Sequence, residues 1–214
     1  MLVTDVNEAL PGGSSLLRNE PVQARSSARL TGLLDAAAGI IDEIGFERLT
    51  TAMVAERAGA SIGTVYRYFP DRIAVVEALA ARSIARLLER LGAAIGEADS
   101  ADWHSALDLA ITAQVEMYRS EPGFRAIRFS ETETADRSGD ADARRSLSDQ
   151  LTSHLVEIFS LERTADLEFA IEVATEMSTS LVARAFLHDP QGDSRFIDES
   201  RLVVAAYLER LPSA

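Results

Sequence analysis

The chain has 214 residues, 47% of them hydrophobic, which is enough apolar material to bury a full-sized core. It has no cysteine, so disulfides, thiolate metal sites and a cysteine nucleophile are excluded, and a reducing cytoplasm is the expected compartment. No run of about 18 apolar residues occurs and the first residues carry acids, so we expect neither a membrane span nor an export signal.

The net charge of −13 argues at first against a nucleic-acid-binding protein. The distribution of charge along the chain changes this interpretation. Residues 25–72 contain six arginines and six acidic residues, whereas residues 73–214 contain 14 arginines and 25 acidic residues. The acidity therefore belongs mainly to the second part of the chain, and a local DNA-binding face on residues 25–72 remains compatible with the charge.

The hydrophobic pattern predicts an all-α fold of about nine helices. Residues 1–24 lack a period and contain the turn-forming stretches LPGGSS and NEP, which indicates a disordered N-terminal arm. Beyond the arm, apolar residues recur every three and four positions, as in amphipathic helices. The expected helices span residues 26–44, 51–58, 61–69, 72–97, 102–119, 122–131, 141–160, 164–188 and 194–211. We divide the chain into the arm at 1–24, a three-helix domain at 25–71 and a larger antiparallel helical bundle at 72–214.

Short polar and turn-forming residues mark the ends of the first three helices. Gly45 follows the first helix as a C-terminal cap, and Thr50 is placed to cap the second helix. Gly59 supplies the sharp turn that a short helix-to-helix connection needs, and Ser61 can cap the third helix. Pro70 stops the third helix.

The third helix has an unusual outer face. Val65 and Phe69 are one turn apart and are expected to pack on the first two helices. At about 100° per residue, Gly63 and Arg67 point away from Val65, with Tyr66 on the flank. An exposed helical glycine costs about 1 kcal/mol relative to alanine, which is explained if another molecule must approach the backbone. The major groove of DNA admits a helix in this way.

The segment LTTAMVAERAGASIGTVYRYFPDR resembles the helix-turn-helix of the TetR (tetracycline-repressor) family of transcriptional regulators. The resemblance covers residues 25–79 and implies a ligand-responsive homodimer that represses by binding double-stranded palindromic operator DNA. It also implies a cytoplasmic, nucleoid-associated protein. The DNA-binding residues predicted for this chain are Thr50, Ser61, Gly63, Thr64, Tyr66, Arg67, Tyr68 and Arg72.

Several of these residues have a second interpretation. Ile62 either packs beside Val65 or touches a thymine methyl group. Tyr68 is either a partly buried structural tyrosine or a phosphate ligand, and Arg67 is either a groove contact or a solvated charge. The arginines at the start of the first helix, Arg25 and Arg29, either anchor the arm on DNA or are simply solvated.

The resemblance implies that the second bundle binds an effector and forms the dimer. The helix at 72–97 follows the third helix directly, so we expect it to link the two functions. The expected pocket, which we predict to take a largely apolar small molecule, draws on Trp103, Leu107, Ile111, Met117, Tyr118, Phe124, Phe129, His154, Phe169 and Met177. Glu172 and Glu176 would favour a cationic effector or form a solvated helix face. The dimer contact is expected from the last two helices, with a monomer as the alternative, through Leu181, Ala185, Val203, Val204, Tyr207, Leu208 and Leu211.

Catalysis finds little support in the sequence. The three histidines, at 104, 154 and 188, lack metal-ligand spacing, and the chain has neither a phosphate-binding glycine loop nor a nucleophile elbow. We therefore expect no enzyme activity, no metal and no cofactor. The rival hypotheses are an effector-independent nucleoid or division factor, an interaction module that keeps the helix-turn-helix for packing alone, and an activator in place of a repressor.

Overall fold

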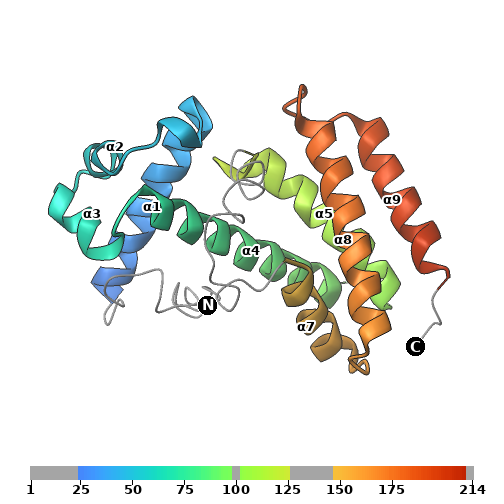
Figure 1. The fold of residues 1–214 in the computed structure, drawn as a ribbon. Helices are drawn as coiled ribbons and strands as arrows, with labels where there is room; N and C mark the ends of the chain where they lie inside the picture. The colour runs from blue at the N-terminus through green and yellow to red at the C-terminus, as the bar shows by residue number, and fades with distance from the viewer. Residues whose placement is uncertain (1–23, 98–101, 126–146, 211–214) are drawn as a thin grey trace. The chain divides into compact units, whose positions relative to one another are not determined.

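The computed structural model describes residues 24–97, 102–125 and 147–210, and within these ranges the regular structure is entirely helical (Figure 1). This confirms the predicted all-α class. Most of the predicted helix at 122–131 lies outside the described residues. Residues 1–23 of the predicted arm lie outside them entirely. The helices are α1 (Ala24–Ile44), η1 (Phe46–Arg48, a 3-10 helix), α2 (Thr51–Arg57), α3 (Ile62–Tyr68), α4 (Arg72–Glu97), α5 (Trp103–Ser120), α7 (Leu147–Phe159), α8 (Ala165–Phe186) and α9 (Ser194–Leu208).

The described residues form two compact units. Residues 24–85 and 122–125 make up the first unit, and residues 86–97, 102–121 and 147–210 make up the second. Helix α4 therefore contributes its first half to one unit and its second half to the other. The sequence suggested a boundary between the DNA-binding and effector-binding parts at residue 72. The first compact unit extends to Ala85, so the division of functions at residue 72 stays a prediction.

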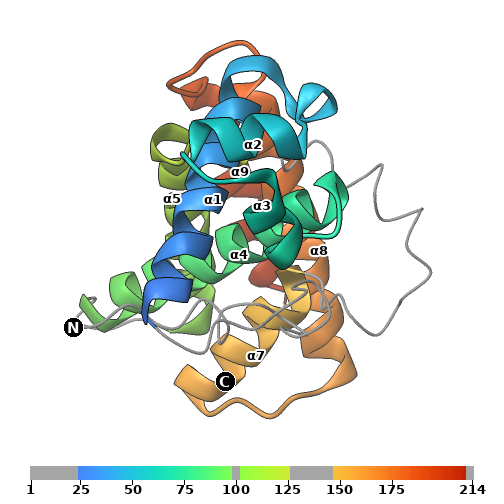
Figure 2. The same cartoon turned by 90° about the vertical axis from the view of Figure 1, so that its left-hand side faces the viewer.

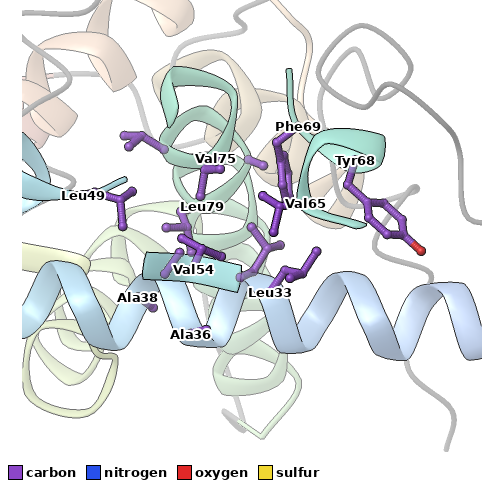
Figure 3. Close-up of a cluster of buried hydrophobic side chains, with 14 of the residues drawn as sticks. Leu33, Ala36, Ala38, Leu49, Val54, Val65, Tyr68, Phe69, Val75 and Leu79 are labelled. Atoms are coloured by element: carbon purple, nitrogen blue, oxygen red, sulfur yellow. The ribbon is translucent and has the colours of Figure 1, made fainter. Parts of the chain in front are cut away.

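The first unit is built around one apolar core (Figure 3). Each helix contributes fully buried side chains, as the helical spacing predicts. These are Leu33 of α1, Val54 of α2, Val65 of α3 and Phe69, which caps the end of α3. Leu79, in the first half of α4, completes the cluster at 1% exposure, which is why this half-helix belongs to the first unit. Figure 2 shows α2 and α3 in front of α1, and α2 packs on both α1 and α3.

The ends of α1, α2 and α3 follow the predicted local signals. Gly45 has φ 82° and its N–H donates to the Ile41 carbonyl at 2.9 Å, while Gly59 has φ 58° in the turn between α2 and α3. The hydroxyls of Thr50 and Ser61 accept hydrogen bonds from backbone N–H groups three residues further on, at 3.2 and 3.1 Å. The predicted caps and the predicted turn are thus confirmed, so the geometry of α2 and α3 is set locally.

Gly123 lies close to the backbone of α1 in the first unit. Its φ is 74°, and a Cβ at this position would lie 2.8 Å from the Ala38 carbonyl oxygen. Its N–H donates to Asp42 Oδ1 at 3.2 Å, and the next residue, Phe124, is buried. Only glycine fits both the backbone conformation and the approach to α1.

In the second unit, α8 and α9 lie side by side, and α5 and α7 both pack on α8 (Figure 1). The buried face of α9 consists of Ile197, Ser200, Val204 and Leu208 at helical spacing. Small residues on α8, such as Ala170 and Ala174, are buried at 1% exposure. These side chains allow the neighbouring helices to approach α8 closely.

Candidate nucleic-acid interface and effector cavity

Helix α3 presents an exposed face that holds few internal contacts. Ile62 and Tyr66 are each 43% exposed, and Gly63 and Arg67 are also exposed. A Cβ added at Gly63 would have Ser61 Oγ at 3.8 Å as its nearest neighbour, which is ordinary van der Waals distance. Nothing in the described part of the chain requires a glycine there, which is compatible with the close approach of another molecule to this part of α3.

The start of α3 is held by a compact hydrogen-bonded turn. Ser61 Oγ accepts from the Thr64 backbone N–H and lies 2.9 Å from Thr64 Oγ1. These contacts anchor the first turn of α3, from which Gly63 projects no side chain. A rigid helix start with an open backbone suits the entry of the helix into a groove.

Tyr66 connects α3 to the start of α2. The Thr51 hydroxyl donates to the Tyr66 hydroxyl in a long bond of 3.4 Å. Thr50, which caps α2, is exposed next to Thr51. Because the N-terminus of a helix and adjacent hydroxyls attract phosphate, Thr50 and Tyr66 together form a surface suited to the DNA backbone.

Tyr68 differs from the other predicted DNA-binding residues because it is only 2% exposed. Its hydroxyl donates to the Ser26 carbonyl at 3.4 Å, and the Arg67 guanidinium lies 5.1 Å from its ring centre. In Figure 3 its ring points away from Val65 and Phe69. The burial favours the packing interpretation of Tyr68 over a phosphate contact.

The arginines of the first unit differ in how far their charge is available. Arg57 forms a bidentate ion pair with Glu43, in which both N···O distances are 2.7 Å. These hydrogen bonds hold the pKa of Glu43 below its usual range. Arg72 donates to the Glu47 carbonyl at 2.8 Å and so ties the start of α4 to η1. The partner of Arg72 in this contact is a neutral carbonyl, whereas that of Arg57 is a carboxylate.

The second unit contains a cavity of about 30 Å³ between helices α5, α7, α8, α9 and the second half of α4. Two of the residues predicted to contact an effector, Leu107 and Ile111, lie in its wall. The wall also contains four polar residues that the sequence analysis did not single out, namely Gln114, Thr175, Ser178 and Thr179. The signal that could have found the three residues on α8 is the recurrence of hydroxyl side chains three and four positions apart on a helix whose other buried residues are apolar.

The remaining residues of the predicted pocket lie outside this wall. Tyr118 stacks on Phe186 with ring centres 4.7 Å apart, Phe124 belongs to the first unit, and Phe169 is 64% exposed on α8. Helical periodicity identifies an inward face but not the helix that covers it, which is why these aromatic residues were grouped together. Phe129 lies outside the described residues, and the others that are absent from the wall are Trp103, Met117, His154 and Met177.

The predicted dimer residues divide into two groups. Ala185, Val204 and Leu208 are buried within the single chain at 2–3% exposure, so they pack against their own neighbours. Leu181, Val203 and Tyr207 are half-buried and remain available to a second subunit. Leu211 lies outside the described residues.

Two family models match the chain. Residues 33–79 match the model for bacterial regulatory proteins of the tetR family, and residues 101–211 match a tetracyclin repressor-like C-terminal domain. The HTH-type transcriptional repressor KstR of Rhodococcus jostii is 36% identical over 58 residues. That alignment spans only 27% of this chain and 27% of the relative.

The similarity to solved structures extends over most of the chain. A TetR-family transcriptional regulator from Streptomyces coelicolor is 34% identical with a TM-score of 0.74, covering 86% of this chain and 98% of its own. FadR of Bacillus subtilis, solved in complex with stearoyl-CoA, shares the fold at 18% identity and a TM-score of 0.59, covering 85% of this chain and 99% of its own. Among the helices that the structure describes, none is both long and apolar enough to span a bilayer.

Proposed function

The chain belongs to the TetR family of bacterial transcriptional regulators, and from this premise we propose that it is a homodimeric repressor released from palindromic operator DNA by a small molecule. Members of the family are DNA-binding regulators and not enzymes. In the proposal, residues 25–71 bind the operator and residues 72–214 bind the effector and form the dimer. The protein would act on DNA in the cytoplasm.

The exposed face of α3 is the observation that carries the DNA-binding part of the proposal. Gly63 leaves the backbone open at a position where the chain itself has room for a side chain. Thr64 and Arg67 would reach base edges beside it, while Thr50, Tyr66 and Arg72 would hold phosphates. Two such helices would occupy half-sites roughly 34–36 Å apart in one palindrome.

The cavity of the second unit supports the effector part of the proposal. FadR of Bacillus subtilis, which shares this fold, was solved with stearoyl-CoA, so a protein of this fold accommodates a ligand with a long apolar chain. We place the effector of the present chain in the cavity between α5, α7, α8, α9 and the second half of α4. An effector that favours the non-binding state by about 1–3 kcal/mol would be a typical allosteric coupling.

The proposal is tested by capturing genomic DNA fragments on the purified protein and sequencing them. We expect a small set of fragments that share a palindrome, with two protomers bound to each site. Binding measured by fluorescence anisotropy should weaken steeply as salt rises, since phosphate contacts release counterions.

The rival functions correspond to different outcomes of the same experiment. Many fragments without a common palindrome would indicate a nucleoid or division factor. Absence of salt-dependent binding would indicate an interaction module. A site upstream of a promoter that raises reporter expression would indicate an activator.

A further inference from the structure

The cavity of the second unit has one polar corner in an otherwise apolar wall. The polar side chains come from α5, with Gln114, and from α8, with Thr175, Ser178 and Thr179. The apolar remainder includes Leu87 and Leu91 of α4. A ligand that fills this space meets hydrogen-bonding groups at one end only.

One hydroxyl in the polar corner has no hydrogen-bond partner within the described part of the chain. Gln114 Nε2 donates to Thr179 Oγ1 at 3.4 Å, and Ser178 Oγ donates to the Thr175 carbonyl at 3.0 Å. Thr175 is only 6% exposed, and its Oγ1 atom is buried without a hydrogen bond to any described residue. Because buried hydroxyls in proteins are nearly always hydrogen-bonded, this atom is suited to an external partner.

The cavity wall also restricts the charge of the partner. None of the described residues that line the cavity is charged. A carboxylate or an ammonium group placed there would lose its hydration without gaining an ion pair, which strongly disfavours binding. A hydroxyl, ketone, ester or amide group would lose much less and could bond to Thr175 Oγ1.

We infer that this cavity selects effectors that are uncharged at the buried end, with one hydrogen-bonding oxygen held by Thr175 Oγ1 and an apolar body along the leucine wall. The inference rests on the proposed effector-responsive function and adds the chemical class of the effector to it. The volume of about 30 Å³ leaves room for about two water molecules. Wall side chains must therefore move on binding, and a slender, flexible chain requires the least movement.

The test uses three probes with the same eight-carbon chain, namely 1-octanol, octanoate and octylamine, at pH 7. The only tryptophan of the chain, Trp103, is buried on α5 one turn before Leu107 of the cavity wall, so its fluorescence can report binding. We expect 1-octanol to bind the full-length protein at least about tenfold more tightly than either charged probe.

The decisive variant is Thr175→Val, which keeps the shape of the side chain and removes its hydroxyl. We expect it to weaken 1-octanol binding about three- to tenfold, the size of one neutral hydrogen bond, while thermal stability is kept or raised. Thr152→Val is the matched control, since Thr152 is buried at 1% exposure outside the cavity wall and its hydroxyl already donates to the Ser148 carbonyl. The control should bind 1-octanol as the wild type does.

Three results would overturn the inference. They are equal 1-octanol affinity of Thr175→Val and wild type, octanoate or octylamine binding as tightly as 1-octanol, and no probe binding at all. Operator binding by the same preparations without any probe is measured in parallel. If the wild type binds operator but the probe results contradict the inference, the proposed effector class is wrong and the proposed function still stands. Failure to bind operator without a probe contradicts the proposed function itself.

Discussion

Gly63 is a position where the requirements of folding and of DNA binding can be measured separately. Because a Cβ at Gly63 meets only Ser61 Oγ at 3.8 Å, the fold would accept alanine. Gly32 on α1 is an internal reference, since it is exposed, helical and without any neighbour within 4 Å of an added Cβ. The two glycines have similar surroundings within the chain, but only Gly63 lies on the proposed DNA-binding face.

We predict that Gly63→Ala and Gly32→Ala each raise the free energy of unfolding by up to about 1 kcal/mol, because alanine is the better helix former. Gly63→Ala alone should weaken operator binding, since its methyl group would occupy the space where DNA approaches the backbone. Urea denaturation and fluorescence anisotropy measure the two effects separately. Unchanged operator affinity in Gly63→Ala would mean that DNA does not approach this part of the helix.

Tyr66 and Tyr68 are two residues apart and are predicted to have different roles. Tyr66→Phe should weaken binding to operator and to random DNA by similar factors, because a phosphate contact carries no sequence information. Tyr68→Phe is the control, since the Tyr68 hydroxyl donates to the Ser26 carbonyl inside the chain. It should lower stability by about 1 kcal/mol and leave DNA affinity unchanged. An effect of Tyr66→Phe at only one base position would contradict the phosphate assignment.

At the scale of elements, the starts of α2 and α3 were the most predictable features. The caps at Thr50 and Ser61 depend on residues three positions apart, so they can be recognised without knowing the tertiary structure. The same holds for α5, where Asp102 Oδ1 accepts from the Ser105 N–H at 2.8 Å. This hydrogen bond is the main reason that the pKa of Asp102 lies below its ordinary value of 3.8, and it outweighs the opposing effect of desolvation.

The Asp102 cap leads to a prediction about pH. A carboxylate whose pKa is lowered by folding contributes its full stability above the unfolded value, and the contribution is lost as pH falls through the lower folded pKa. Asp102→Ala should therefore lower the free energy of unfolding by about 1 kcal/mol at pH 7 and by less as pH drops below 3.8. Asp102→Asn retains a capping oxygen without the titration, so it serves as the control in urea denaturation at several pH values. A pH-independent difference between Asp102→Ala and wild type would exclude a role for the ionised cap.

Contacts between elements were less predictable than their ends. The sequence predicted the helix at 72–97 as a link, and α4 is indeed one uninterrupted helix over those residues. Its first half packs in the core of the first unit through residues such as Leu79, and its second half lines the cavity through Leu87 and Leu91. Which neighbours each half would meet could not be known from its own apolar stripe, because both halves show the same spacing.

At the scale of the whole molecule, the residues predicted to form the dimer differ in how deeply the single chain buries them. Tyr207 is half-buried on α9, whereas Val204 is 3% exposed and packed within its own chain. These two residues were predicted together as interface residues, yet a charge at each should have a different consequence. A charge at Tyr207 would disturb a contact between subunits, and a charge at Val204 would disturb the fold.

We predict that Tyr207→Glu yields a folded monomer and that Val204→Glu lowers the melting temperature strongly. Light scattering gives the mass, and circular dichroism gives the fold. Ile158→Glu is the control, because Ile158 is an exposed hydrophobic residue on α7, 39% exposed and outside the two helices of the proposed interface. A Tyr207→Glu protein that keeps the dimer mass would place the interface elsewhere.

The sequence by itself determined the helical class, the ends of the first helices and the exposed face of α3, because these features depend on residues within one or two turns of each other. Gly45, Thr50, Gly59 and Ser61 all have the local roles that their positions predicted. The tertiary structure alone decided that Phe169 faces outward and that Val204 packs within its own chain. It also decided that the Thr175 hydroxyl has no hydrogen-bond partner among the described residues. The physical reason is that burial of a helical side chain depends on the helix that packs over it, and that helix can come from any distance along the chain.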